Sequence, residues 1–298
     1  MQHPLTPYLL AVGANLCFGT ASIAFSDYAR RFSATWVNQL KVSIAFIGFL
    51  LTFLAFESFI PLPPAGHAYL LASGFVGLFF GDFFLFRSLA ELGPSRTLVL
   101  YTFEPLLVGL YGYFFLRQGL SLYQVLAVLC MIACVLTFML ERNRLTGSFG
   151  LRSFSFAFLG VFLDAVGVML SRQAYEQDAG LGPFQVNLTR AIGALAGFLF
   201  MSPKFPLLLT RDLKALAPRG RWIILGACVM GTFLSLSLYL TALKTAHVAT
   251  LTAISITSPV WVSLIEHFRK REWPNRYLWT AFALFLFGFI LMQVPSSS

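Results

Sequence analysis

The residues with the clearest potential for chemistry are acidic side chains deep inside apolar stretches. Glu104, in the sequence YTFEP, is tenth in the stretch 95–116, and Asp164 is similarly deep in the stretch 154–174. If these stretches cross a membrane, neither carboxylate can reach bulk water, so each must face protein or a wet cavity. There it could bind a substrate ammonium or carry a proton. The alternative is a neutral or paired carboxyl group that only holds helices together.

Two basic residues also lie inside apolar stretches, at matching places in the two halves of the chain. Lys41 and Arg190 are six or seven residues from the ends of their stretches, which is about 10 Å along a helix. They could anchor an anionic group or pair with an internal carboxylate. Alternatively, their long side chains could reach back to the membrane interface. Asn38 and Asn187 precede them by three residues on the same helix face, where hydrogen bonds between helices are expected.

Two further features of the third apolar stretch have simpler interpretations. Asp82 lies nearer the end of that stretch, about a turn from Arg87, and a local salt bridge between them is the favoured interpretation, with a charge-relay role as the alternative. Gly74, Gly77 and Gly81 form a small-residue face, which suits close helix packing or the lining of a pore. Packing is the favoured interpretation.

Two prolines interrupt apolar stretches near their centres. Pro105 and Pro259 have no N–H, so the carbonyls of Tyr101 and Ser255 would lose their helical hydrogen bonds. Interrupted helices at mid-membrane form the binding sites of secondary transporters. The candidate substrate-binding residues are therefore Tyr101, Phe103, Glu104, Pro105, Ser255, Thr257, Pro259 and Trp261, together with Gly81 and Tyr239.

The composition indicates which elements must position these residues. The chain has 298 residues, of which 58% are hydrophobic and 11% charged, with a mean hydropathy of +0.77. A soluble domain carries about a quarter charged residues, so this is a membrane protein. Apolar runs long enough to cross the hydrocarbon predict an all-α membrane protein with ten transmembrane helices. They are expected at 8–27, 34–56, 67–88, 95–116, 121–140, 154–174, 184–202, 221–242, 247–268 and 276–294.

An internal repeat predicts how these helices are organised. Residues 70–139 align with 224–293 without a gap, so that Gly77 matches Gly231 and Pro105 matches Pro259. We expect a five-helix repeat at 1–148 and a second one at 149–298. Because five is odd, the second repeat must enter the bilayer from the opposite side. Such inverted repeats suggest transport by alternating access through a central cavity.

The end of the chain resembles a known repeat signature. The sequence SPVWVSLIEHFRKREWPNRYLWTAFALFLFGFILM at 258–292 resembles that of the EamA-type branch of the drug/metabolite transporter superfamily. The signature has a proline that opens a helix, a glutamate thirteen residues later, and a glycine in a closing apolar helix. These three positions are filled by Pro259, Glu272 and Gly288.

The first half has drifted from this signature, because it keeps Pro105 but has Gln118 and Cys134 in the other two positions. The resemblance covers nearly the whole chain. It implies ten helices, two inverted five-helix repeats and the export of small metabolites, and it is closest in character to aromatic amino-acid exporters. The second half has Ser258 where the first has Glu104, so proton or ammonium chemistry is expected in the first half alone.

The functional prediction is a secondary transporter that exports amino acids, aromatic or other apolar ones, and related small metabolites. The alternatives are transport of a nucleoside or a drug-like cation and, less favoured, an intramembrane enzyme or a lipid scramblase. The sequence has no Walker A motif for ATP and no HExxH motif, and its four cysteines form no CxxC pair, so no cofactor and no metal are expected. The oligomeric state stays open.

The charge distribution bears on localisation and partners. A multi-pass protein of the inner membrane is expected, with the lipid bilayer as a partner and no nucleic acid, because lipid-facing loops account for the net charge of +9. Of the lysines and arginines outside the two embedded ones, three lie on the side of the termini and sixteen on the other. This count places the termini outside the cytoplasm, whereas the family resemblance implies the reverse.

Overall fold

The computed structural model describes residues 6–104, 107, 122–147, 150–178, 180–245, 254, 257–270 and 275–292. These residues form helices and no strand. The first half contains α1 (Thr6–Arg31), α2 (Ala34–Phe56), α3 (Pro64–Ser73), η1 (Gly74–Gly81), α4 (Asp82–Leu92), α5 (Pro94–Tyr101) and α7 (Leu122–Thr146). The second half contains α8 (Leu151–Gln177), α9 (Pro183–Met201), α10 (Phe205–Ala215), α11 (Pro218–Cys228), η2 (Val229–Leu234), α12 (Ser235–Thr245), α14 (Thr257–Lys270) and α15 (Arg276–Met292).

Six helices in the described part are long and apolar enough to cross a membrane. They are α1, α2, the continuous run from α3 to α4, α8, α9 and the run from α11 to α12. The helix α15 is apolar but shorter, and α7 is not among the six. The stretches expected at 95–116 and 247–268 lie partly outside the described residues. The all-helical membrane fold is thus confirmed, whereas the number of ten transmembrane helices stays a prediction.

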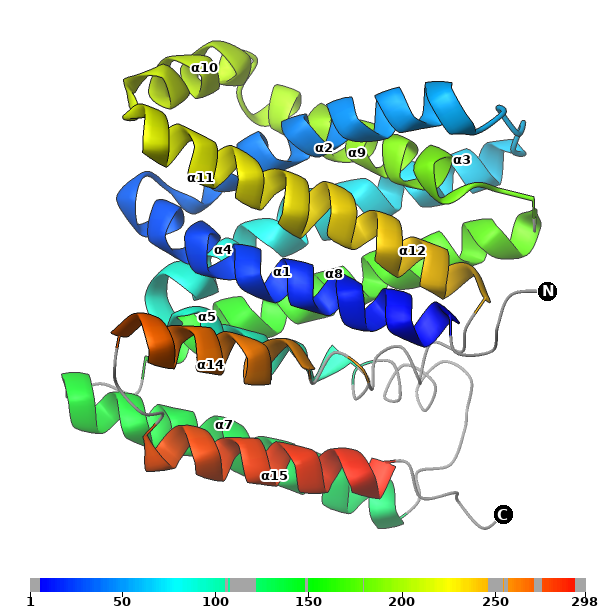
Figure 1. Ribbon diagram of the computed structural model, residues 1–298. Coiled ribbons are helices and arrows are strands. Elements are labelled where there is room, and N and C mark those ends of the chain that lie inside the picture. Colours follow the sequence, from blue (N-terminus) through cyan, green and yellow to red (C-terminus); the bar gives the residue numbers. More distant parts are fainter. Residues whose placement is uncertain are drawn as a thin grey trace.

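The two halves pack against each other in a reciprocal pattern. In the second half, α11, η2 and α12 pack against α1, while α3, η1 and α4 of the first half pack against α8. Equivalent helices also pair across the halves, α2 with α9, α5 with α14 and α7 with α15. Figure 1 shows α1 and α8 running in opposite directions. This arrangement is the one that an inverted repeat requires, although the boundary at residues 148 and 149 lies outside the described part and stays a prediction.

One end of the bundle carries most of the charge. We call it the basic end: it is the end where α1, α9 and α14 finish (Figure 1), and it holds Arg30, Arg31, Lys204, Arg219 and Arg269. The start of α1 and the end of α15 both lie at the opposite end. The described helices therefore begin and end at the same end of the bundle.

The third helix of each half contains a π-helical segment at an aligned position. In η1 the N–H of Asp82, which follows the segment, bonds to the carbonyls of Gly77 and Phe79 and bypasses Leu78. In η2 the N–H of Ser235 likewise bonds to residues five and three positions back. π-Helical turns are rare in proteins, but those that occur often lie at functional sites. Such a turn redirects a side chain and frees a carbonyl. Both segments lie at the interface between the halves.

The two buried asparagines stabilise these segments. Asn38 donates hydrogen bonds from Nδ2 to the carbonyls of Leu78 and Phe79, both at 3.0 Å. Asn187 donates to the carbonyl of Leu236, just after η2, at 3.3 Å. The expectation that both asparagines bond between helices is confirmed. In the first half the Asn38 amide donates to the carbonyl of Leu78, which the backbone N–H of Asp82 bypasses.

Glycines allow α9 to pack directly against the backbone of α3 and η1. A Cβ on Gly74 would collide with the carbonyl of Arg190, and one on Gly193 would collide with the carbonyl of Leu71. Gly77 similarly faces the Cα of Gly167 in α8. The glycine face at 74, 77 and 81 therefore serves helix packing, and this close approach brings Arg190 toward the first half.

We expect Gly193→Ala to destabilise the protein by about 1 to 3 kcal/mol, because an added methyl group in a packed contact against backbone must displace a helix. The matched control is Gly226→Ala, because a Cβ there meets nothing within 4 Å. Thermal unfolding in detergent would measure both. Equal unfolding temperatures for the two variants would contradict the close approach of α9 to α3.

Candidate functional site

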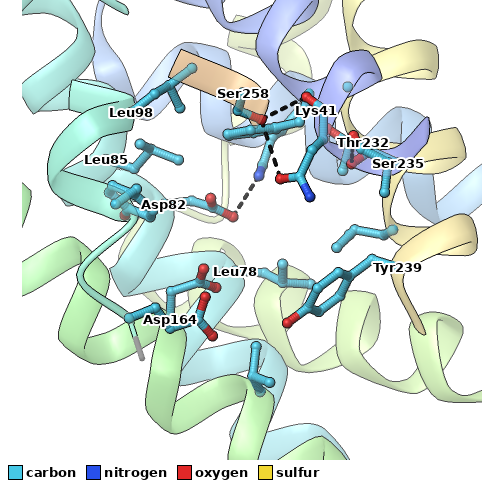
Figure 2. A pocket seen from close by; sticks show the side chains of 18 of the residues that line it. Lys41, Leu78, Asp82, Leu85, Leu98, Asp164, Thr232, Ser235, Tyr239 and Ser258 are labelled. Carbon is cyan, nitrogen blue, oxygen red and sulfur yellow. Dashed lines mark hydrogen bonds and ion pairs between the residues drawn. The ribbon is translucent and has the colours of Figure 1, made fainter. Parts of the chain in front are cut away.

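A cavity of about 140 Å³ lies between the two halves near the centre of the bundle. Residues from helices of both halves line it, and Figure 2 shows several of them pointing toward the same space. The lining residues used below are Asn15, Phe18, Lys41, Leu78, Asp82, Leu85, Leu98, Tyr101, Glu104, Asp164, Val168, Arg190, Thr232, Ser235, Leu236, Tyr239 and Ser258.

Lys41 and Asp82 form a buried ion pair on one wall of this cavity. The Nζ of Lys41 on α2 lies 2.5 Å from Oδ2 of Asp82 on α4, with 4% and 10% of the two side chains exposed. The ammonium also lies 5.1 Å from the centre of the Phe86 ring. The expected pairing of Asp82 with Arg87 is wrong, because the Arg87 guanidinium instead lies over an aromatic ring, that of Phe83. Helix geometry turns Arg87 to another face of α4.

Arg190 is the second buried cation of the cavity. It is 1% exposed, so its side chain does not reach back to the membrane interface. Its Nε donates to the hydroxyl of Ser73 at 2.9 Å, while its Nη1 is buried and has no hydrogen-bond partner in the described residues. The alternative of an outward-reaching side chain is therefore wrong for Arg190, and also for Lys41, which is 3% exposed. Arg190 retains a donor for an anionic group.

The helix that contains YTFEP is interrupted at the cavity. The helix α5 ends at Tyr101, and a turn at Thr102 and Phe103 separates it from Glu104. The hydroxyl of Thr102 donates to the carbonyl of Val99 and so helps to terminate the helix. Glu104 then lines the cavity, and its buried Oε1 has no hydrogen-bond partner among the described residues. The break thus places a carboxylate where helical hydrogen bonds stop.

Other polar groups face the same space without partners. The hydroxyls of Tyr101, Tyr239 and Thr232 are buried and make no hydrogen bond within the described part of the chain. Asp164 on α8 also lines the cavity, and its carboxyl group interacts electrostatically with Glu104. Buried polar atoms are normally paired. Together with Glu104 and Arg190, these atoms form an unsatisfied set that a polar ligand could complete.

Asn15 and Ser258 close one side of the cavity through a direct contact between α1 and α14. The Ser258 hydroxyl donates to the backbone carbonyl of Asn15 at 2.7 Å and lies 3.2 Å from its side-chain oxygen (Figure 2). Ser258 occupies the repeat position of Glu104, and Asn15 that of Asp164. The repeat counterparts of the two carboxylates are therefore a neutral pair that satisfies itself, whereas one ionisable residue comes from each half, Glu104 from the first and Asp164 from the second.

Several sequence-predicted residues lie elsewhere. Phe103 packs in an apolar cluster with Phe138 and Phe285, and Gly81 packs against the backbone of Asp164. Trp261 is 40% exposed and donates from Nε1 to the hydroxyl of Thr20. None of these three is among the residues that line the cavity.

Of the two prolines expected to break helices, the structure describes only Pro259. Pro259 is the third residue of α14, a first-turn position at which a missing N–H costs no helical hydrogen bond. Pro105 and Ser255 lie outside the described residues, and so does the side chain of Thr257. The interruption that the structure does show is at Thr102 and Phe103, just before Pro105.

The sequence-based selection missed some polar lining residues, chiefly Thr232 and Ser235. Both follow Gly231, which the repeat alignment had matched to Gly77, so the alignment carried a signal for this part of the third helices. Asn15 also lines the cavity and was not among the selected residues. Single hydroxyl residues in apolar stretches are common, and depth alone does not separate a lining residue from one that bonds its own helix.

The charges of the cavity do not balance. Asp82, Glu104 and Asp164 supply three carboxyl groups, whereas Lys41 and Arg190 supply two cations. Lys41 is paired with Asp82. The polar groups that remain for a ligand are the Nη1 donor of Arg190, the carboxyl groups of Glu104 and Asp164, and three hydroxyls. Such a set can bind a carboxylate and an ammonium at once, and it has one carboxylate left for a proton or a second positive group.

The chain was compared with protein families, curated proteins and solved structures. The model of the EamA-like transporter family matches residues 5–140 and again residues 151–294. A solved structure described only as "Crystal structure of protein" is similar over 96% of each chain, with a TM-score of 0.64 and 19% sequence identity, and shows the fold alone. No curated protein matches the chain.

Proposed function

The chain belongs to the EamA-like transporter family, and from that premise we propose that it is a secondary transporter that exports amino acids through the central cavity by alternating access. The observation that carries this proposal is the set of unpaired buried polar atoms that converge on one cavity between the halves. A family of small-molecule transporters implies a substrate, and these atoms indicate its chemistry.

The two ends of a zwitterion match the free groups of the cavity. The substrate carboxylate would accept from Nη1 of Arg190, which is held in place through Ser73 but is otherwise unpaired. The substrate ammonium would lie against the carboxyl groups of Glu104 and Asp164. The hydroxyls of Tyr101 and Tyr239 can complete either contact. Because the donors and acceptors are held by different helices of both halves, binding would bridge the halves.

The remaining wall suits an apolar side chain. Phe18, Leu78, Leu85, Leu98, Val168 and Leu236 line the cavity together with the polar groups. Ligand sites combine such an apolar surface with a few placed polar groups that fix the orientation of the ligand. This supports amino acids with apolar or aromatic side chains. The same wall would also accept a nucleobase.

Alternating access is supported by the contacts that would have to change. At the basic end, hydrogen bonds and ion pairs join the two halves. Arg269 pairs with Asp27 at 2.7 Å, Ser95 donates to Glu266 and Ser153 donates to Glu91. These pairs must separate before the cavity can open toward that end. The side chains of the Arg269–Asp27 pair are 50% and 46% exposed, so breaking this ion pair costs little.

The second candidate is export of an organic cation, and the excess of one carboxylate favours it. If Glu104 and Asp164 are both ionised beside Arg190 and the Lys41–Asp82 pair, the cavity carries one negative charge. A drug-like cation would neutralise it without using Arg190. A zwitterion would instead need a proton on one of the two carboxyl groups, which would couple transport to the proton gradient.

Flux into liposomes distinguishes these candidates. We expect purified, reconstituted protein to take up labelled apolar amino acids saturably, above the level of empty vesicles, and to transport tetraalkylammonium cations and nucleosides weakly. The matched variant is Arg190→Gln, which should abolish amino-acid flux because the carboxylate donor is lost. Unchanged cation flux in this variant, together with no saturable amino-acid flux in the unmodified protein, would replace the first candidate by the second.

A further inference from the structure

The connection between α9 and α11 at the basic end presents apolar and cationic side chains side by side. In α10, Leu207 and Leu208 are 73% and 44% exposed, and Trp222 near the start of α11 is 75% exposed. Lys204, Arg211 and Lys214 are also exposed. Helix positions three and four residues apart share a face, so the two leucines lie between Lys204 and Arg211 on the outer side. We call Lys204, Leu207, Leu208, Arg211, Lys214 and Trp222 the α10 surface.

The fold holds this surface in one orientation. On the inner side of α10, Phe205 and Leu209 are buried and join two different apolar clusters of the bundle. Arg221 donates from Nη2 to the carbonyls of Lys214 and Leu216, both at 3.0 Å, and so caps the end of α10. The hydroxyl of Tyr28 on α1 donates to the carbonyl of Gly220 at 2.7 Å. The exposed cations and leucines are therefore preorganised rather than carried on an unattached loop.

The positive charge of the connection is largely unpaired. Residues 204–221 contain five lysines and arginines and one acidic residue, Asp212. Asp212 pairs with Arg211 at 3.1 Å. Lys204, Lys214 and Arg219 make no ion pair with any residue in the described ranges. A fixed cluster of cations that the protein itself does not neutralise is complementary to an external anion.

The α10 surface is found in one repeat only. The corresponding connection of the first half, residues 57–63, contains no helix and no lysine or arginine. Its one charged residue, Glu57, accepts hydrogen bonds from the N–H groups of Phe184 and Gln185 at the start of α9. Because the repeated fold forms without an equivalent of α10 in the first half, this helix is not required by the repeat itself.

We propose that the α10 surface is a binding site for an anionic phospholipid. The headgroup phosphate would lie against Lys204, Arg211 and Lys214, and the upper part of an acyl chain would lie against Leu207 and Leu208. Binding at the membrane interface gains strength from apolar side chains that enter the headgroup region and from the attraction of lysine and arginine to anionic lipids. Trp222 has the position expected of an interfacial tryptophan. The occupant is a lipid rather than a free anion because the apolar residues share the face.

Fluorescence quenching by brominated lipids tests this proposal without requiring transport. The probe is brominated phosphatidylglycerol at a low mole fraction in phosphatidylcholine vesicles that contain the protein. The signal of Trp222 is obtained by subtracting the spectrum of Trp222→Phe. We expect this signal to be quenched more strongly by brominated phosphatidylglycerol than by brominated phosphatidylcholine at the same mole fraction. Equal quenching by the two lipids, or its reversal by inorganic phosphate, would overturn the proposal.

Charge removal provides a matched comparison. The test variant combines Lys204→Gln, Arg211→Gln and Lys214→Gln, and the control combines Arg144→Gln, Arg152→Gln and Arg276→Gln. The control side chains are also exposed cations of the basic end. One cation near an anionic surface changes affinity about fivefold. We expect the affinity for phosphatidylglycerol to fall by about one hundredfold in the test variant and little in the control. Equal losses in both would indicate a general charge effect and overturn the assignment to α10.

Discussion

Replacing Lys41 by methionine is expected to destabilise the protein by about 3 to 5 kcal/mol, because it leaves the carboxylate of Asp82 buried and unpaired. The pair is nearly inaccessible, with the ammonium and carboxylate atoms 2.5 Å apart, and it ties α2 to α4. The replacement Asp82→Leu should have a similar cost, because it strands the ammonium of Lys41 instead. The free energy of unfolding, measured by denaturant titration in mixed micelles, reports both.

The double variant Lys41→Met with Asp82→Leu provides the control. Replacing a whole buried ion pair by apolar side chains of similar size is often neutral or stabilising, so we expect the double variant to unfold close to the unmodified protein. A double variant as unstable as the sum of the two single ones would show that the residues act independently, contrary to the observed contact.

The second large effect is expected from Glu104→Gln. The amide keeps the shape of the side chain but loses the charge that would hold a substrate ammonium. A hydrogen bond to a charged group contributes about 1.5 to 3 kcal/mol, so the apparent KM of flux should rise by about tenfold to one hundredfold. In the unmodified protein we also expect the apparent affinity to weaken at a pH low enough to protonate both Glu104 and Asp164, because a protonated carboxyl group no longer pairs with an ammonium. This pH dependence should be reduced in the variant.

Glu176→Gln is the matched control for this substitution. Glu176 is exposed near the end of α8 and pairs with Arg172, outside the cavity. The Glu176→Gln variant carries the same chemical change, and the KM and the pH profile of its flux should equal those of the unmodified protein. If the pH profile of Glu104→Gln coincides with that of the unmodified protein, Glu104 is not the group at which protons compete with the substrate ammonium. Asp164 would then be assigned that role.

Depth in an apolar stretch proved a sound guide to the cavity. Lys41, Glu104, Asp164 and Arg190 were selected because hydrocarbon does not solvate ionised groups, and all four line one cavity. Closeness to a proline in sequence was a poorer guide. Among the residues selected in that way, Tyr101 lines the cavity, whereas Phe103 and Trp261 do not. Neighbours along a helix point in different directions, so sequence distance from a break does not predict which side chain enters a cavity.

Partners could not be predicted in the same way. Asp82 was expected to pair with Arg87 because the two are close in sequence, yet it pairs with Lys41 on another helix. The π-helical segments η1 and η2 could not be predicted from the sequence, because their glycine content alone does not indicate a π-helix. They depend on contacts such as the amide of Asn38, which comes from a helix forty residues away in the chain.

The sequence by itself determined that this chain is an all-helical membrane protein built as a repeat, and which ionisable residues must avoid lipid. The helices follow from the lengths of the apolar runs, and the repeat follows from the internal alignment. The choice of ionisable residues follows from the cost of exposing charge to hydrocarbon, which acts on each residue separately. The tertiary structure alone decided which carboxylate is neutralised by Lys41, which donor of Arg190 stays free and which hydroxyls face the same space. Such pairings depend on how helices of the two halves approach each other, and the close backbone contacts at Gly74 and Gly193 set that approach.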